Sequence, residues 1–247
     1  MIWTTRYIVT HELNMEAVIL AGGQGTRLRP HTDEIPKPLL PVGGRPVAEI
    51  LLKQMQKTGV KHVFLAVNHR SEQIITAIGD GRKYGLKIDY SQEKQPLSTV
   101  GPLKLIKNLP ENFIVANADV LTDLNFNDIF QTHLKNKANL TVATYARTLP
   151  TDFGVLTVSD SGMAVGFNEK PVFNFIVSMG IYVFSKSILD FVPSNRPFGF
   201  DQLMLTLFDQ HIPVHTYPYN GYWLDIGRID DYQKANDDVK RISDLIS

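Results

Sequence analysis

Short apolar runs recur along the chain, and segments with a helical pattern separate them. The runs "AVIL", "VFLAV", "FIVAN" and "LTVATY" occupy residues 17–20, 63–67, 113–117 and 140–145. Continuous apolar runs of this length are typical of parallel strands that are buried on both faces of a sheet. We therefore expect these four segments to be strands of one mostly parallel sheet.

The clearest helix is predicted between the first two strands, over residues 46–57. Pro46 stands at a first-turn position, and Gly59 follows just past the expected end. Apolar residues recur on one face of this helix at Val47, Ile50, Leu51 and Met55. A strand, a helix and a second strand in this order are typical of a βαβ unit.

After about residue 150 the pattern changes to shorter strands. The segments "GVLTV" and "AVGFNE" flank "SDSG", which is a hairpin signal, and "VSMGIYVF" predicts a further strand over residues 177–184. A closing helix is predicted over residues 229–246. Its apolar face would consist of Tyr232, Ala235, Val239, Ile242 and Ile246. We expect an α/β, Rossmann-like fold with a mostly parallel mixed sheet and a smaller antiparallel part after residue 150.

Composition limits the class of ligand. The 247 residues suffice for one large α/β domain or two small ones. Lys plus Arg equals Asp plus Glu at 25 each, so the chain lacks the basic excess expected of a protein that binds nucleic acid or an anionic membrane. The absence of cysteine excludes disulfides and thiolate metal sites, and cytoplasmic localisation is the expectation. A small molecule is the predicted ligand.

The first 14 residues are interpreted separately from residues 15–247, which we expect to form a single domain. They lack the basic-then-apolar pattern of a signal peptide, and no apolar run approaches the roughly 20 residues of a membrane span. Met15 could itself be a start. A leader, a linker remnant and an edge strand all remain open for residues 1–14.

Residues 21–30, "AGGQGTRLRP", follow the first strand and concentrate glycine and arginine. The dinucleotide fingerprint G-x-G-x-x-G fails, because its third position falls on Leu28. The P-loop pattern fails as well, because no Lys-Ser or Lys-Thr follows these glycines. What remains is a strand that runs into bare backbone N–H groups beside Arg27, which suits a phosphate ligand. The alternative is an ordinary strand-to-helix turn with a solvated arginine.

Lys37 stands between Pro36 and Pro38, which restrict the local backbone. Its ammonium group is therefore presented from a stiff segment, and Arg27 with Lys37 could clamp one polyphosphate. A solvated surface lysine is the alternative.

The whole segment resembles the signature of the sugar-phosphate nucleotidyltransferases, G-G-x-G-T-R-L-x-P-x-T followed by P-K-P. The matching residues are Gly22, Gly23, Gly25, Thr26, Arg27, Leu28, Pro30, Thr32, Pro36 and Lys37. The resemblance covers about residues 15–247. It implies a GT-A-like nucleotidyltransferase fold that transfers a nucleoside monophosphate from a nucleoside triphosphate (NTP) to a sugar 1-phosphate and releases pyrophosphate.

That chemistry requires a divalent metal, because a triphosphate must be neutralised before an anionic nucleophile approaches it. Asp119 closes the strand "FIVANAD", at the carboxyl edge of the sheet where ligands bind. Asp225 lies in "YWLDIGRIDDY". Both resemble the magnesium aspartates of the family, so Mg2+ is the implied cofactor. A strand-end cap and a turn residue are the alternative interpretations.

The sugar side is implied by "GFNEKP". Glu169 and Lys170 would point to opposite faces of a strand unless the chain bends, and Pro171 favours a bend. By resemblance, Lys170 holds the sugar phosphate and Glu169 binds sugar hydroxyls, while Gly154 and Gly180 let the backbone approach the sugar. The resemblance thus divides the domain into a nucleotide-binding half at about 15–150, a sugar-binding half at about 151–228 and the closing helix at 229–247.

The base is implied by "PLSTVG", which resembles the guanylyltransferase loop P-L-G-T-A-G. Ser98 and Val100 depart from that loop, Ala118 replaces a common glycine, and Ser178 replaces a common asparagine. GTP is the favoured triphosphate, and UTP, CTP and dTTP are the alternatives. The nucleotide-binding residues implied are Leu20, Ala21, Gly22, Gly23, Gly25, Thr26, Glu93, Pro96, Ser98 and Thr99.

The function predicted is therefore a sugar-1-phosphate nucleotidylyltransferase similar to the mannose-1-phosphate guanylyltransferases. Arg27, Lys37 and Lys170 would be catalytic, and an NTP and a sugar 1-phosphate would be the partners. A non-catalytic, regulatory relative that binds a nucleotide sugar is the alternative of another class. The presence of every charged residue of the family motifs favours the enzyme. The sequence leaves the oligomeric state open, a homo-oligomer included.

Overall fold

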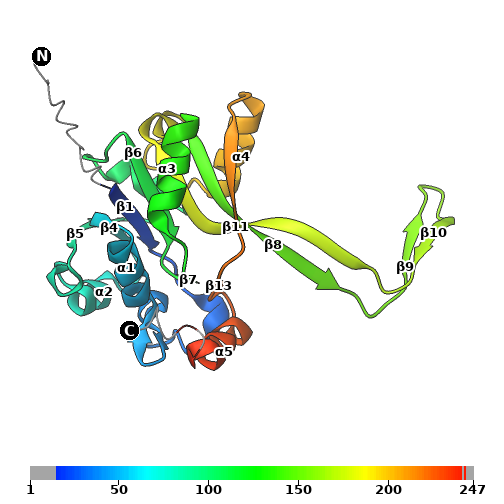
Figure 1. The fold of residues 1–247 in the computed structure, drawn as a ribbon, viewed down its shortest axis with the longest axis horizontal. Helices are drawn as coiled ribbons and strands as arrows, with labels where there is room; N and C mark the ends of the chain where they lie inside the picture. The colour runs from blue at the N-terminus through cyan, green and yellow to red at the C-terminus, as the bar shows by residue number, and fades with distance from the viewer. Residues whose placement is uncertain (1–14, 241, 243–247) are drawn as a thin grey trace, which may run out of the picture.

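The computed structural model describes residues 15–240 and 242, and its centre is a seven-stranded sheet (Figure 1). The strand order is β12-β8-β11-β6-β1-β4-β5. All neighbours pair in parallel except β11, which runs antiparallel to both β6 and β8. The strands are β1 (Met15–Ala21), β4 (Val60–Val67), β5 (Lys87–Gln92), β6 (Asn112–Asn117), β8 (Leu140–Pro150), β11 (Val172–Ser185) and β12 (Val214–Tyr219). The predicted mostly parallel α/β sheet is confirmed.

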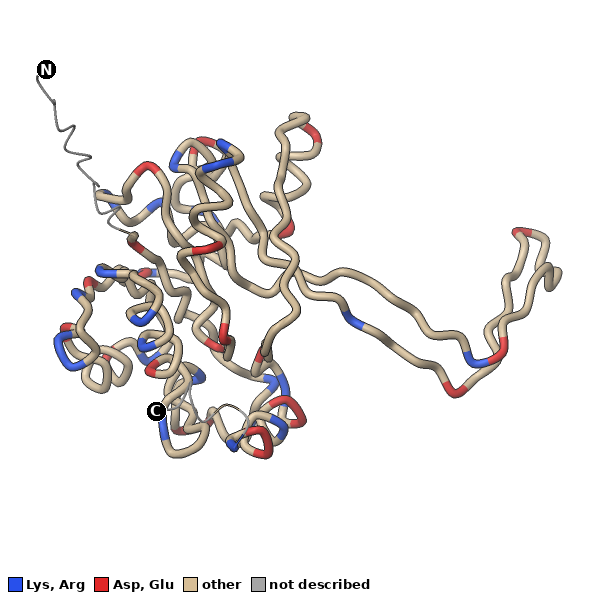
Figure 2. Tube along the Cα trace, in the orientation of Figure 1, with Lys and Arg blue, Asp and Glu red and all other residues tan. Residues whose placement is uncertain are grey.

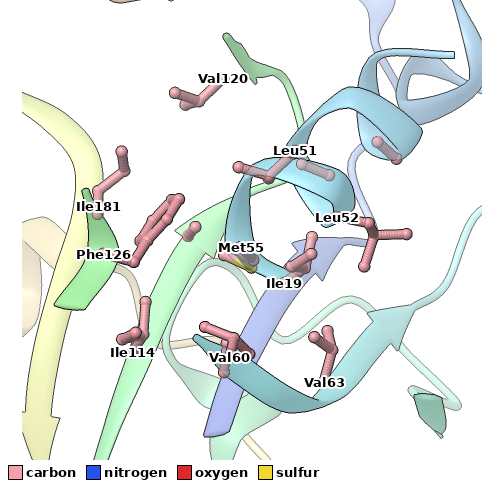
Figure 3. Close-up of a cluster of buried hydrophobic side chains, with 14 of the residues drawn as sticks. Ile19, Leu51, Leu52, Met55, Val60, Val63, Ile114, Val120, Phe126 and Ile181 are labelled. Atoms are coloured by element: carbon pink, nitrogen blue, oxygen red, sulfur yellow. The ribbon is translucent and has the colours of Figure 1, made fainter. Parts of the chain in front are cut away.

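Helices cover both faces of the sheet because the strand residues alternate between two cores. On β1, Ala17 and Ile19 join one buried cluster and Val18 joins the other. Figure 3 shows the first cluster, where Met55 of α1 and Phe126 of α3 pack on Ile19 and Ile114. The helices are α1 (Val47–Lys57), α2 (Ser71–Ile78), α3 (Phe126–Asn136), α4 (Phe200–Asp209) and α5 (Ile229–Asp237). Residues of α1, α2 and α3 pack into the first cluster, and those of α4 pack into the second.

Three two-stranded pairs accompany the main sheet. They are β2 (Pro41–Val42) with β3 (Arg45–Pro46), β7 (Val120–Thr122) with β13 (Trp223–Asp225), and β9 (Val155–Val158) with β10 (Ala164–Asn168). The last pair is the hairpin predicted around "SDSG". The boundary near residue 150 stays a prediction. However, β11 and β12, which follow that boundary, return to the main sheet, so residues 151–228 are interleaved with the nucleotide-binding half.

The closing helix is shorter than predicted. The α-helical part of α5 ends at Asp237, and a 3-10 turn continues it over Asp238–Lys240. Its apolar face is as expected, because Ala235 and Ile242 are buried in a third cluster with Leu28 of the glycine segment. Ile246 and the predicted leader at residues 1–14 lie outside the described residues. The C-terminal segment thus supports the underside of the glycine segment.

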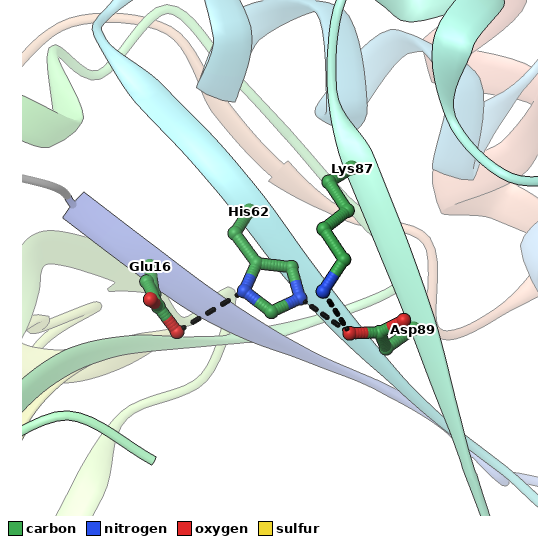
Figure 4. A network of polar contacts seen from close by, with 4 residues as sticks. All are labelled: Glu16, His62, Lys87 and Asp89. Atoms are coloured by element: carbon green, nitrogen blue, oxygen red, sulfur yellow. Dashed lines mark hydrogen bonds and ion pairs between the residues drawn. The ribbon is translucent and has the colours of Figure 1, made fainter. Parts of the chain in front are cut away.

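A polar network lies at the amino-terminal ends of β1, β4 and β5, away from the carboxyl edge (Figure 4). His62 contacts Glu16 at 3.2 Å and Asp89 at 2.8 Å, and Lys87 contacts Asp89 at 2.7 Å. The Lys87 ammonium and then His62 lower the pKa of Asp89. These charges compensate one another, which gives the network a structural role in joining three strands. In the described part of the chain, no helix combines the length and the apolar character needed to cross a membrane.

Candidate active site

A cavity of about 590 Å³ opens at the carboxyl edge of the sheet, where β1 lies between β4 and β6. From β1 the chain continues to β4 on one side, and from the neighbouring β6 it continues to β8 on the other side. Ligands of open α/β sheets bind in the crevice at such a point. All ten residues predicted to bind nucleotide line the cavity, and so do Arg27, Lys37, Asp119 and Asp225. We call this cavity the pocket.

The glycine segment forms one wall of the pocket. Gly25 has φ of +65°, a left-handed conformation that favours glycine, and its carbonyl accepts hydrogen bonds from Leu28 N at 2.9 Å and Thr32 Oγ1 at 2.8 Å. A Cβ on Gly25 would lie 3.2 Å from Lys37 Cβ. The absence of a side chain therefore lets the proline-flanked lysine approach the loop.

Gly22 and Gly23 differ in what surrounds them. A Cβ on Gly22 would lie 2.8 Å from Glu93 Oε1, so packing requires this glycine. A Cβ on Gly23 would meet no atom within 4 Å, and its φ is not positive. Neither packing nor backbone conformation requires a glycine at position 23. A ligand that must touch the backbone there would require it.

We expect Gly23→Ala to leave the fold intact and to weaken triphosphate binding. The added methyl group enters the open pocket and keeps a phosphate from the backbone N–H groups. The expected KM for the triphosphate rises about tenfold, the factor that corresponds to about 1.4 kcal/mol. Steady-state kinetics measure this change, and thermal unfolding of the same variant is the control. A lowered Tm with an unchanged KM would contradict the interpretation.

Two carboxylates and a lysine meet at the floor of the pocket. Strand β13 pairs with β7 so that Asp225 faces Val120, and Ile226 N donates to Asp119 O at 3.0 Å. This pairing brings Asp119 and Asp225 together from positions more than a hundred residues apart. Lys37 Nζ forms an ion pair with Asp119 Oδ2, and both side chains are largely buried, with exposed fractions of 14% and 17%.

Burial and the proximity of the two carboxylates disfavour the charge on Asp225. Burial, and after it the neighbouring Asp119, raises the pKa of Asp225 to about 6, although Lys37 and Arg27 act to lower it. Asp119 Oδ1 and Asp225 Oδ1 are buried and have no hydrogen-bond partner. Unpartnered buried carboxylate oxygens are costly unless a cation or donor meets them.

These carboxylates fit a magnesium ion. Mg2+ is commonly held by one or two protein carboxylates while substrate phosphates and water complete its coordination. No group of three or more acidic, histidine or cysteine side chains with metal-site geometry occurs among residues 15–240 and 242. A bound triphosphate would therefore have to supply further oxygen ligands.

Residues 93–99, which include the segment expected to contact the base, form the opposite wall of the pocket. Glu93 is buried and accepts a hydrogen bond from Leu97 N at 2.8 Å, and burial raises its pKa. Thr99 Oγ1 accepts from Phe200 N at 2.8 Å, which ties the loop to α4. Ser98 has φ of +66°, in the left-handed region that favours glycine. A glycine at this position, as in the guanylyltransferase loop, adopts such a φ without strain. Ser98 adopts the left-handed conformation although it carries a side chain.

The predicted sugar-side residues do not line the pocket. Gly180 is buried in β11, where a Cβ would lie 2.6 Å from Asn117 Nδ2. Gly154, Glu169 and Lys170 lie together on a projecting part of the chain, since a Cβ on Gly154 would lie 3.2 Å from Glu169 Oε2. The backbone bends there as Pro171 suggested, and Lys170 has φ of +44°, which is rare before a proline.

Several pocket residues were missed by the sequence analysis. Asn117 ends β6 and lines the pocket two residues before Asp119, and Asn68 follows β4 and donates to Glu93 Oε2 at 3.5 Å. Behind the pocket lining, Tyr182 of β11 is buried, and its hydroxyl accepts from Ser178 Oγ at 3.2 Å. Burial raises the pKa of Tyr182 to about 12, and Asp225 and Asp119 add to the effect. Polar residues directly after buried strands were the available signal.

Comparison with known proteins decides the family. The family model described as "Nucleotidyl transferase" matches residues 16–242. The chain belongs to this family. The chain is 32% identical over 243 residues to the UTP–glucose-1-phosphate uridylyltransferase of Synechocystis, with 90% of this chain and 62% of the relative covered. It is 35% identical over 227 residues to the mannose-1-phosphate guanyltransferase beta-A of Xenopus laevis, with 88% and 62% covered.

The fold of the chain is also similar to a solved structure. HddC from Yersinia pseudotuberculosis, complexed with GMP-PN, superposes with a TM-score of 0.68 at 25% identity, with 90% of this chain and 98% of that chain covered. The chain spans 62% of the length of the two curated relatives. These relatives include both a uridylyltransferase and a guanyltransferase, so family membership does not decide the base.

Proposed function

We propose that the protein transfers a nucleoside monophosphate, from GTP in preference to other triphosphates, to a sugar 1-phosphate. The observation that carries this proposal is the pair Asp119 and Asp225. Each has a buried, unpartnered oxygen, and both lie beside Lys37 in the pocket that the glycine segment forms. A protein that only bound a nucleotide sugar would need no such pair of carboxylates with buried, unpartnered oxygens.

The proposed reaction forms one bond and breaks one bond at phosphorus. An oxygen of the sugar phosphate attacks the α-phosphorus, and the bond from that phosphorus to the pyrophosphate oxygen breaks. A divalent cation held by Asp119 and Asp225 would supply neutralising charge for the triphosphate. Lys37 is fixed by its ion pair with Asp119, which positions its ammonium group for the negative charge that develops on the phosphates.

Arg27 contributes from the glycine segment. It lines the pocket, and its Nη2 lies 3.8 Å from the position that a Cβ on Gly227 would take, next to the Asp225 strand. A guanidinium group there can bind two phosphate oxygens at once. Leu28, the next residue, is fully buried and anchors the arginine. In this proposal Arg27 stabilises the charge of the leaving pyrophosphate.

Arg27→Ala is expected to lower kcat/KM by about tenfold, the factor for about 1.4 kcal/mol of lost transition-state stabilisation. Arg29→Ala is the matched control. Arg29 lies two residues away in the same segment, its side chain is 66% exposed, and its ion pair is with Asp33 at 3.3 Å. The control is expected to keep wild-type kinetics. Equal losses in both variants would show that general surface charge, rather than Arg27, attracts the substrate.

Guanine is favoured by the resemblance of the base loop to that of guanylyltransferases and by the complex of the related HddC with GMP-PN. The loop offers backbone groups rather than a charged side chain to the base. A site that hydrogen-bonds one base edge leaves buried polar groups unpaired when another base enters, and each loss costs about 1–3 kcal/mol.

The proposal is tested by a matrix of GTP, UTP, CTP and dTTP against several sugar 1-phosphates, with pyrophosphate release as the readout. We expect release only when both substrates are present, and a kcat/KM for GTP at least about tenfold above the others. Preference for a pyrimidine triphosphate would overturn the guanylyl assignment. Release without a sugar 1-phosphate would overturn the transfer reaction.

A further inference from the structure

The outer parts of β8 and β11, together with the hairpin β9–β10, form a long two-stranded projection (Figure 1). We call residues 146–177 the arm. Val172 pairs with Pro150 and Val177 pairs with Tyr145 in one continuous antiparallel register. Five residues of strand separate these pairs, which places the outer end of the ribbon about 17 Å beyond its base. Three of the predicted sugar-side residues, Gly154, Glu169 and Lys170, lie still further out, whereas Gly180 stays in the main sheet.

The base of the arm is fixed on the body. Arg147 stacks over the Trp223 ring at 5.0 Å, and Trp223 Nε1 donates to Met179 O at 3.0 Å. The register shifts once, between Ser178 and Tyr182, before the arm leaves the sheet. The hydrogen bonds found for residues 151–171 join arm residues to one another. Folding the tip back onto its own pocket would require breaking the ladder between the two strands.

The surface of the arm is apolar. Eleven of the fourteen exposed large hydrophobic residues in the described part of the chain belong to it, with exposed fractions from 45% to 78%. Successive strand residues alternate, so Phe173 and Phe175 lie on one face of β11 while Val172 and Ile176 lie on the other, and all four are exposed. Figure 2 shows how few charges the arm carries. A two-stranded ribbon with two apolar faces is marginal in water without a partner.

The apolar surface is large enough for a stable interface. Large side chains present about 150–250 Å² each, so the exposed fractions correspond to on the order of 1,000 Å² on each arm. A standard interface buries about 800 Å² for each partner. Aromatic enrichment and depletion of charge are features of interface cores.

The arm also carries residues that the pocket lacks. Glu169 and Lys170, which the resemblance assigns to the sugar phosphate, are exposed near the tip. A shallow hollow lies between the base of the arm and the pocket, and Arg27, Asp225 and Gly227 line both. An arm that carries site residues requires a pocket of the same kind, and a second copy of this chain provides one.

Resting on the proposed function, we propose that the arm of one copy enters the pocket of a second copy, so that Glu169 and Lys170 complete the sugar side of the partner's site. The exchange is reciprocal and closes a twofold dimer, which is a common route to dimers when an element leaves its own body. Each active site is then built from two chains.

The decisive test is complementation between two inactive chains. Asp119→Asn retains the arm and Lys170→Ala retains the pocket, and each is expected to be at least about tenfold less active than wild type on its own. The two chains are co-expressed with different tags and purified through both tags. Exchange gives one intact composite site in every mixed dimer, hence about half of the wild-type activity. Doubly tagged Lys170→Ala with Lys170→Ala is the background control.

An inactive mixed dimer beside an active wild type would overturn the exchange while leaving the proposed function intact. Full activity of Lys170→Ala alone would overturn the assignment of Lys170 and the exchange with it. An inactive wild type would refute the proposed function, and a second measurement then decides on the exchange.

The second measurement is molecular mass by light scattering. Phe153 lies on the arm and is 78% exposed, whereas Leu205 is an exposed apolar residue on α4, at 64%. We expect the wild type and Leu205→Ser to be dimers and Phe153→Ser to shift to monomer. A monomeric wild type, or a dimer that only Leu205→Ser disrupts, would overturn the proposal.

Discussion

Asp225→Asn is expected to abolish the proposed transfer activity and at the same time to stabilise the fold. The activity is expected to fall by a factor on the order of 100 or more, which is typical of losing one preorganised electrostatic group. The stability gain has the opposite origin. Asp225 is ionised at neutral pH although burial and Asp119 oppose its charge, and asparagine removes that charge.

The sign of the effect follows from proton linkage. The pKa of Asp225 is about 6 in the folded state and near its ordinary value of 3.8 in the unfolded chain. Between these values the folded state binds more protons, so this group lowers the free energy of unfolding as the pH rises, and its full penalty is present above pH 6. Two pKa units correspond to about 3 kcal/mol, and we expect a gain of about 1–3 kcal/mol at pH 7.5.

Denaturant unfolding with a metal chelator measures this gain at pH 7.5 and again at pH 4, where most of it should be lost. The pH 4 measurement is the internal control for effects of the substitution other than charge. A variant that is less stable than wild type at pH 7.5 would contradict the electrostatic account of the pocket.

Lys37→Ala is expected to inactivate as strongly but to destabilise. Lys37 pairs with Asp119 and also lowers the pKa of Asp225, so its removal leaves two buried carboxylates near one remaining cation, Arg27. Breaking a largely buried pair from one side leaves an uncompensated charge, and we expect a loss of about 2 kcal/mol in the free energy of unfolding at pH 7.5. The expected fall in kcat is again on the order of 100-fold.

The double variant Lys37→Ala with Asp225→Asn is the matched control. If charge repulsion causes the destabilisation, neutralising Asp225 restores most of the lost stability while activity stays absent. A double-mutant cycle from four unfolding curves measures the coupling. Strictly additive effects would show that Lys37 and Asp225 do not interact, and the clustered site would then need another explanation.

The sequence predicted the elements that bury apolar residues on both faces and the loop that follows the first strand. It also placed Arg27, Lys37, Asp119 and Asp225 in one site, and the structure brings all four to the pocket. These positions could be predicted because strand ends and glycine segments have local signals. The roles of these residues stay proposals.

The arm could not be predicted because its sequence pattern does not differ from that of the core. Strand β11 is mostly apolar along its whole length, yet Val172–Ile176 is exposed on the arm while Met179 and the residues up to Phe184 are buried in the sheet. Apolar residues on both faces indicate that a strand is covered, but not which molecule covers it. The same limit explains why Glu169 and Lys170 were expected in the chain's own pocket.

The end of α5 and two asparagines of the pocket were also missed, because neither has a distinct local signal in the sequence. The 3-10 turn after Asp237 keeps Ile242 buried without continuing the α-helix, and apolar spacing alone does not distinguish these two geometries. Asn117 and Asn68 carry no motif of their own. Their place in the pocket follows from the strands that end beside them.

In the proposed reaction, the nucleoside monophosphate that contains the α-phosphorus is transferred to a sugar 1-phosphate. The most direct measurement uses GTP with radioactive phosphorus at the α position, or in a parallel sample at the γ position, incubated with the protein, Mg2+ and a sugar 1-phosphate. We expect the α label to appear in a nucleotide sugar and the γ label to appear in pyrophosphate. We expect Asp119→Asn to form neither product. Transfer of the γ label to the sugar, or recovery of both labels in unreacted GTP with every sugar 1-phosphate and triphosphate tried, would contradict the proposed reaction.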